Sequence, residues 1–199
     1  MKKQIVVIHG GETFDSYDAY LTFLASYQID FDHLGTKGWK SSLIDILEES
    51  HDVIAPRMPN AMNAKYKEWK MYFEKYIPHL ENGVQLVGHS LGGIFLAKFL
   101  SENIFPKTIG ATFLVAAPYG NTDSYSLADF VLPDSLELLS KQSPAIFLYH
   151  SEDDPIVSFT DLHTYATKLP GSIVRTFSDR GHFDQESFPE LIADLQSIH

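Results

Sequence analysis

One serine of this sequence lies in a motif that can hold a nucleophile. Ser90 is the centre of Gly88-His89-Ser90-Leu91-Gly92, a G-x-S-x-G pattern, with an apolar β-type run before it at 84–87 and an apolar helical run after it at 94–100. In such a strand–turn–helix the serine occupies a strained turn, and small neighbours let the backbone close. Its hydroxyl then points out at a helix N-terminus, which favours developing negative charge. The pattern predicts a nucleophilic serine; a plain turn that uses glycine for its geometry is the alternative.

A serine hydroxyl needs a base to take its proton, and the base needs a third group to hold its tautomer. Asp153 and Asp154 follow an apolar run at 145–150, and His182 follows another at 173–177. If these runs are parallel strands, their carboxyl ends meet at one edge of a sheet. The sequence therefore predicts that one of these acids and His182 come together with Ser90. Asp123, after the run at 109–116, is an alternative acid.

The elements that must position these groups alternate along the chain. Strands are predicted at 5–8, 51–55, 84–87, 109–116, 145–150 and 173–177, and helices at 18–25, 43–47, 64–77, 94–100, 161–169 and 189–198. Ser41 and Ser42 are expected to cap the second helix, and short helices are expected near Leu127 and Leu136. This alternation predicts a parallel sheet covered by helices on both faces, in one domain over residues 1–199.

At the chemistry-bearing positions the sequence resembles the α/β-hydrolase superfamily. The matching stretches are Gly88-His89-Ser90-Leu91-Gly92, Asp154-Pro155-Ile156-Val157 and Gly181-His182-Phe183. Over nearly its whole length the chain is similar to the small, cap-less serine hydrolases of the YdeN and retinoblastoma-binding-protein-nine type. The resemblance implies an α/β-hydrolase domain with a mostly parallel six-stranded sheet in a three-layer sandwich. It also implies a triad of Ser90, Asp154 and His182, and an oxyanion hole from the N–H groups of Leu91 and Gly11.

The choice of Asp154 over Asp153 depends on the family-like spacing and on Pro155. A proline restricts the residue before it to extended conformations, which would aim the Asp154 side chain reproducibly. One feature departs from the family pattern, because the segment 12–40 is longer than the corresponding loop of the smallest members. Its aromatic residues, from Phe14 to Trp39, have two interpretations: core packing, which is favoured, or the lining of an acyl pocket.

The activity expected from this resemblance is cleavage of an ester or related acyl bond through an acyl-enzyme, with no metal and no organic cofactor. An interaction module with weak turnover, and acyl transfer or peptide cleavage by the same triad, are the alternatives. Candidate substrate contacts are Phe14, Tyr17, His89 and Tyr119. For His89 a packing or hydrogen-bonding role is the alternative, and His9 is expected to fix the turn at Gly10 and Gly11.

The composition and net charge of the chain limit which binding partners are expected. The 199 residues carry a formal net charge of −11, with a pI of about 5.1, which argues against nucleic acid and anionic membrane surfaces. There is no cysteine, so thiolate nucleophiles, disulfides and cysteine-ligated metals are excluded. The apolar run at 5–8 is too short for a secretion signal, and we expect a cytoplasmic protein. The expected partner is a small acyl substrate; no pattern in the sequence supports a protein partner.

Overall fold

The computed structural model describes residues 2–29, 31, 35, 38–122 and 125–198. Within this part of the chain, a six-stranded sheet has the order β2-β1-β3-β4-β5-β6, and every neighbouring pair is parallel. The strands are β1 (Lys3–Ile8), β2 (His51–Ile54), β3 (Val84–His89), β4 (Ile109–Val115), β5 (Ile146–Ser151) and β6 (Ile173–Phe177). All six predicted strands are confirmed, with ends shifted by a residue or two.

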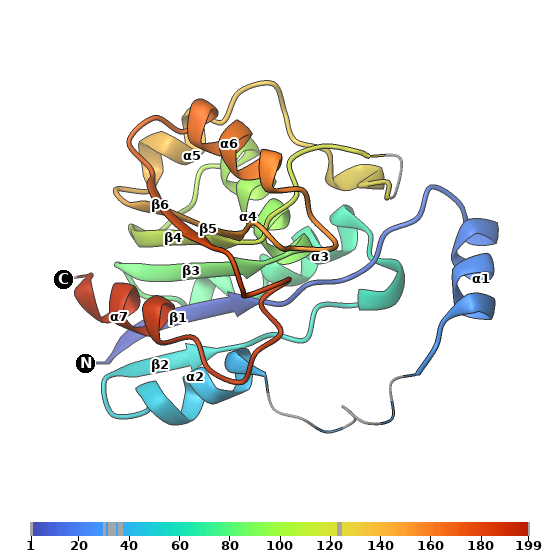
Figure 1. Cartoon of the computed structure of the whole chain (residues 1–199). Coiled ribbons are helices and arrows are strands. Elements are labelled where there is room, and N and C mark those ends of the chain that lie inside the picture. The colour runs from blue at the N-terminus through green and yellow to red at the C-terminus, as the bar shows by residue number, and fades with distance from the viewer. Residues whose placement is uncertain (1, 30, 32–34, 36–37, 123–124, 199) are drawn as a thin grey trace.

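Helices cover both faces of this sheet (Figure 1). On one face lie α3 (Tyr66–Phe73), α4 (Leu91–Glu102), α5 (Glu137–Gln142) and α6 (Phe159–Lys168), and on the other lie α2 (Trp39–Leu47) and α7 (Pro189–Ser197). Two apolar clusters, one per face, join the sheet to these layers, which is why β3 is buried at every position. The result is the expected three-layer sandwich in a single domain. No helix among the described residues has the length and apolarity to cross a bilayer.

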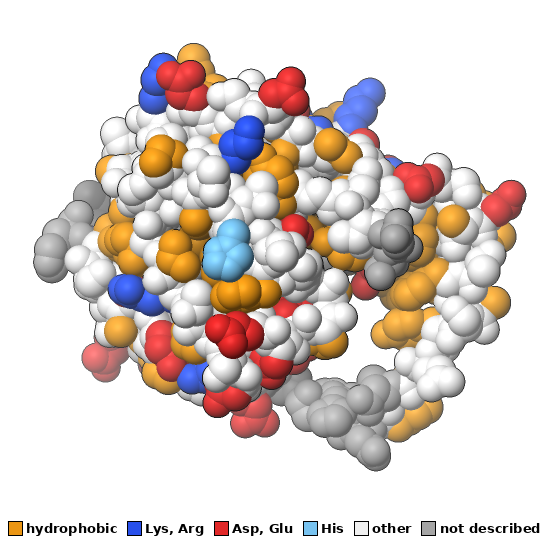
Figure 2. Space-filling model, turned by 45° about the horizontal axis from the view of Figure 1, so that its top comes forward, with side chains coloured by type: hydrophobic (Ala, Val, Ile, Leu, Met, Phe, Trp, Pro, Cys, Tyr) orange, Lys and Arg blue, Asp and Glu red, His pale blue; other side chains and the backbone are white. Residues whose placement is uncertain are grey.

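The helix α1 (Tyr17–Ser26) belongs to neither layer. Ser16 caps it by accepting a hydrogen bond from the Ala19 N–H at 3.1 Å, but none of its residues is buried. Figure 2 shows an opening between this helix and the body of the molecule, with hydrophobic side chains on the helix. Core packing is therefore the wrong interpretation for the described aromatic residues of this segment, except for Trp39, which is 1% exposed.

The start of α2 differs from the prediction. The helix begins at Trp39, and neither Ser41 nor Ser42 caps it. Trp39 fixes the start because its backbone N–H donates to the Gln185 carbonyl at 3.0 Å and its indole N–H donates to the Phe183 carbonyl at 2.8 Å. These tertiary bonds outweigh the local capping preference of the serines.

The helix predicted over 64–77 is shorter in the structure, where α3 spans Tyr66–Phe73. The short 3₁₀ helices η1 (Ala61–Asn63) and η2 (Ile77–His79) flank α3. The carboxylate of Asp129, in η3 (Ala128–Phe130), accepts the Tyr66 N–H at 3.0 Å and so starts α3. The helix packs on the sheet through its apolar side chains, since Trp69 and Phe73 are fully buried.

Candidate active site

Ser90 forms the sharp turn between β3 and α4. Its φ of 53° and ψ of −123° are rare for a residue with a side chain. Two backbone bonds hold this conformation: the Ser90 N–H donates to the Val115 carbonyl at 2.8 Å, and the Ser90 carbonyl accepts the Gly93 N–H at 2.8 Å. The strained turn predicted from the sequence is therefore present and tied to both β4 and α4.

The two glycines of the motif leave no room for a side chain. A Cβ atom on Gly88 would lie 2.4 Å from the Gly92 carbonyl oxygen, and one on Gly92 would lie 2.3 Å from the Ile8 carbonyl oxygen. The turn is thus pressed against its own helix and against the end of β1. This contact brings the loop after β1 next to the serine, because a Cβ on Gly10 would lie 3.1 Å from that of Ser90.

Asp154 and His182 contact each other directly. The two carboxylate oxygens of Asp154 lie 2.9 and 3.1 Å from His182 Nδ1, with the aspartate side chain 0% exposed and the histidine 8%. Burial raises the pKa of this carboxyl, but hydrogen bonds from His182 and from the N–H groups of Val157 and Ile156 outweigh it and hold the pKa below its usual value. An ionised Asp154 keeps the proton of a neutral imidazole on Nδ1, which leaves Nε2 free as a base.

Asp153 has different partners. Its carboxylate accepts hydrogen bonds from the Ser151 hydroxyl and from the Gly181 N–H, the latter at 2.9 Å. The Arg180 N–H in turn donates to the Ser151 hydroxyl at 3.0 Å. Asp153 therefore ties the loop that carries His182 to the end of β5 and does not touch the imidazole.

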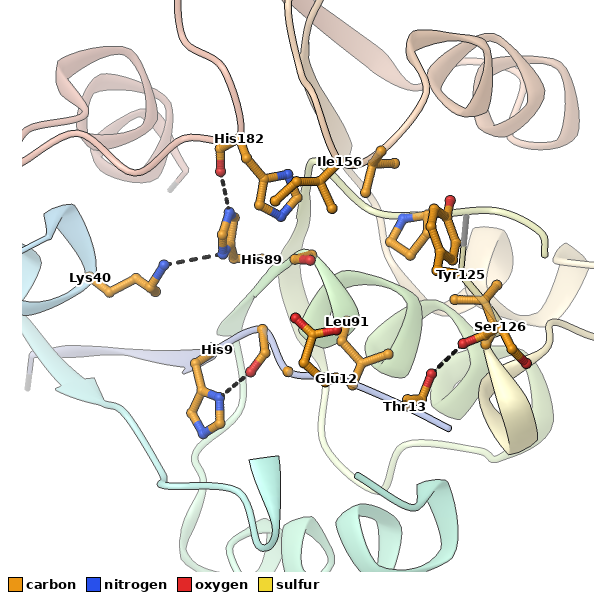
Figure 3. A pocket seen from close by; sticks show the side chains of 16 residues that line it. His9, Glu12, Thr13, Lys40, His89, Leu91, Tyr125, Ser126, Ile156 and His182 are labelled. Atoms are coloured by element: carbon orange, nitrogen blue, oxygen red, sulfur yellow. Dashed lines mark hydrogen bonds between the residues drawn. The ribbon is translucent and has the colours of Figure 1, made fainter. Parts of the chain in front are cut away.

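Ser90 and His182 line one cavity of about 380 Å³ at the carboxyl ends of the strands (Figure 3). Leu91 and Gly11, the predicted oxyanion-hole residues, line it too. Leu91 is the first residue of α4, where a backbone N–H has no acceptor within the helix. Gly11 is confined, since a Cβ there would lie 2.6 Å from the Ala61 carbonyl oxygen. Of the groups that the resemblance implied, only Asp154 does not line the cavity, and it contacts His182, which does.

His9 fixes the loop after β1, as the sequence predicted. Its Nδ1 lies 2.6 Å from the Gly10 carbonyl oxygen, and its Nε2 accepts the Met58 N–H at 2.8 Å. Since Nε2 accepts, the proton of the neutral ring is on Nδ1 and donates to Gly10.

Three predicted substrate contacts are not among the cavity-lining residues. Phe14 packs on Phe23 with ring centroids 5.1 Å apart, Tyr17 is 66% exposed, and Tyr119 packs on Tyr165 at 5.0 Å. Their contact with a substrate stays a prediction. His89 does line the cavity, although both of its ring nitrogens have partners. The alternative acid Asp123 lies outside the described residues.

The sequence analysis missed much of the cavity wall. The further lining residues are Glu12, Thr13, Lys40, Pro118, Tyr125, Ser126, Leu127, Ile156 and Val157. Several follow a strand, and the rule that strand ends meet could have found them. Partial burial raises the pKa of the Glu12 carboxyl against the opposing effect of His182. Burial lowers the pKa of Lys40 to about 8, opposed by Asp184.

Comparison with known proteins gives the family of this chain. Residues 31–192, a span that includes Ser90, Asp154 and His182, match the family model described as serine hydrolase. The chain belongs to the serine hydrolase family. The serine hydrolase RBBP9 of Rattus norvegicus is 26% identical over 170 residues, which cover 83% of this chain and 88% of that protein.

Solved structures show the fold of this serine hydrolase. The ydeN gene product of B. subtilis superposes with a TM-score of 0.80 at 20% identity, over 99% of this chain and 98% of that one. The esterase EaEST of Exiguobacterium antarcticum gives a TM-score of 0.64 at 14% identity, over 98% of this chain and 92% of that one. These likenesses establish the α/β-hydrolase fold.

Proposed function

We propose that this serine hydrolase cleaves a carboxylic ester or a related acyl bond, with Ser90 as nucleophile, His182 as base and Asp154 as the acid that orients it. One observation carries the proposal: His182, which is bonded to Asp154, lines the same cavity as the strained Ser90. A serine, an imidazole and a buried carboxylate in one site are the groups that nucleophilic acyl transfer requires.

The proposed reaction has two halves. Ser90 Oγ bonds to the substrate carbonyl carbon while His182 Nε2 takes the hydroxyl proton, and Asp154 stabilises the imidazolium. The carbonyl oxygen becomes an oxyanion that accepts hydrogen bonds from the Leu91 and Gly11 N–H groups. The C–O bond to the leaving group then breaks, and His182 gives its proton to that group. A water molecule attacks the acyl-enzyme in the same way, which releases the acid and restores Ser90.

The cavity suits a small acyl substrate. Its volume lies at the lower end of the range for small-molecule sites, and part of its wall is apolar, from Leu91, Leu127, Ile156 and Val157. The esterase named above has the same fold and supports an ester as the first substrate to try.

The test is labelling with a fluorophosphonate, followed by hydrolysis of p-nitrophenyl esters. Ser90→Ala should abolish both and leave the unfolding transition nearly unchanged. Ser126→Ala is the matched control, because Ser126 lines the same cavity and should keep both. EDTA should change neither, since no step uses a metal. Activity near wild type in Ser90→Ala contradicts the proposal, and absence of labelling in the wild type favours an interaction module.

A further inference from the structure

A chain of hydrogen bonds ends on the backbone of His182, apart from the bond that Asp154 makes to its ring. Lys40 Nζ lies 3.1 Å from His89 Nδ1, and His89 Nε2 lies 2.8 Å from the backbone carbonyl oxygen of His182 (Figure 3). The three residues come from α2, from the end of β3 next to Ser90, and from the loop after β6. These hydrogen bonds therefore join the loop that carries His182 to His89, the residue before Ser90.

The direction of these bonds follows from the chemistry of their ends. A carbonyl oxygen can only accept, so His89 Nε2 carries the proton and donates it to His182. Burial lowers the pKa of His89 well below its usual value, and the charges of Lys40 and His182 lower it further. The ring is therefore neutral, and its Nδ1 accepts a hydrogen bond from the Lys40 ammonium.

Two effects disfavour a positive charge at the position of Lys40. It lies in the first turn of α2, where the positive end of the helix dipole repels a cation. Burial also opposes its charge, and among the described residues no carboxylate lies within ion-pair distance of it. Lys40 is attracted by the charge of Asp184, but it forms no ion pair with a described residue and does not favour the start of α2. Its bond to the residue next to Ser90 therefore indicates a functional role.

We propose that Lys40 and His89 are positioning residues that hold the backbone of His182 in place for catalysis. The carbonyl bond fixes the loop, and the His89 ring packs on the His182 ring with centroids 4.9 Å apart. The Trp39 ring also contacts the His89 ring, edge to face, with centroids 5.9 Å apart. With its backbone held here and its ring held by Asp154, His182 is constrained at both ends. This inference depends on the proposed function, and it assigns His89 to positioning and not to substrate contact.

Three substitutions test the hydrogen bonds that link Lys40, His89 and His182. His89→Phe keeps an aromatic ring but removes both bonds, Lys40→Met keeps the side-chain stem, and Lys40→Arg keeps a charged donor. Because a displacement of about 1 Å in a reacting group lowers rates by about a hundredfold, we expect His89→Phe to lower kcat by about ten- to a hundredfold. Lys40→Met should lower kcat by about tenfold with KM within about twofold, and Lys40→Arg should restore most of it.

The double variant Lys40→Met/His89→Phe separates positioning from substrate binding. If Lys40 acts only through His89, the double variant is no slower than His89→Phe alone. Multiplied losses, or a rise in KM at unchanged kcat in Lys40→Met, would overturn the proposal by showing that Lys40 contacts the substrate.

Labelling of the wild type by fluorophosphonate separates this inference from the proposed function. No labelling refutes the proposed function itself. If the wild type is labelled and kcat is unchanged in both His89→Phe and Lys40→Met, only the positioning role is refuted. Circular dichroism checks the fold of each variant. Should His89→Phe unfold, Lys40→Met and its arginine rescue decide the question, because Lys40 is only partly buried.

Discussion

Asp153 and Asp154 are neighbours in the chain, yet their carboxylates hold two different parts of one loop. Asp154 contacts the ring of His182 at 2.9 Å, whereas Asp153 accepts the backbone N–H of Gly181, one residue earlier, at 2.9 Å. Consecutive residues thus orient the imidazole and secure the backbone that carries it.

This division predicts unequal effects of the two amide substitutions. Asp154→Asn removes the charge that stabilises the imidazolium and favours the wrong tautomer, a change that lowers turnover by about 10⁴ in a serine protease with the same groups. Asp153→Asn keeps an oxygen acceptor for the loop and should cost about tenfold or less. Turnover of both variants on one ester is the measurement. The reverse order would exchange their roles, and small losses in both would direct attention to Asp123.

A second prediction concerns the turn at Ser90. Gly92→Ala should lower the free energy of unfolding by about 3 kcal/mol or more, because the new Cβ would overlap the Ile8 carbonyl of β1. Gly120→Ala is the control, since a Cβ there meets nothing within 4 Å and its φ lies outside the left-handed region. Urea unfolding of both variants gives the comparison. Equal stabilities would mean that the turn relaxes without loss.

The third prediction concerns acyl-chain preference. Ile156 lines the cavity although it is 55% exposed, so Ile156→Ala should shift the preferred chain length of p-nitrophenyl esters with little change in stability. Tyr17→Ala is the comparison, because the sequence predicted a pocket role for Tyr17 and the structure places it outside the lining. A shift with Tyr17→Ala and none with Ile156→Ala would favour the sequence-based interpretation.

The fourth prediction follows from the lowered pKa of Lys40. Between about pH 8 and the usual lysine value of 10.5, the unfolded chain holds the Lys40 proton more firmly than the folded protein does. The free energy of unfolding should therefore rise with pH in this window relative to a variant that cannot titrate there. Urea unfolding of wild type and Lys40→Met at about pH 7 and about pH 9.5 measures the difference. An unchanged difference would show that burial does not perturb the lysine.

The catalytic candidates were predictable because each follows a strand. Ser90, Asp154 and His182 come after β3, β5 and β6, and parallel strands bring their carboxyl ends to one edge of the sheet. Apolar runs mark β3 and β5 clearly, since both strands are buried at every position and show no polar alternation. The chemistry and the fold could thus be inferred together from local patterns.

Lys40 could not be predicted in the same way. A lysine near a helix start ordinarily belongs to the solvated surface, and its partner His89 lies 49 positions further along the chain. Trp39 made the prediction harder still, because its tertiary bonds moved the start of α2 and so changed where Lys40 points. The aromatic residues of α1 misled for the opposite reason: their types are typical of a core that this helix does not join.

The helix α1 contributes neither to the packed interior nor to the lining of the cavity. None of its residues contributes to the packed interior, so changes along Tyr17–Ser26 have little effect on folding. The same stretch follows the loop that supplies Gly11, Glu12 and Thr13 to the cavity. Because no residue of α1 lines the cavity either, a combinatorial library confined to this helix would vary its exposed apolar surface with few losses to misfolding and without replacing a group of the site.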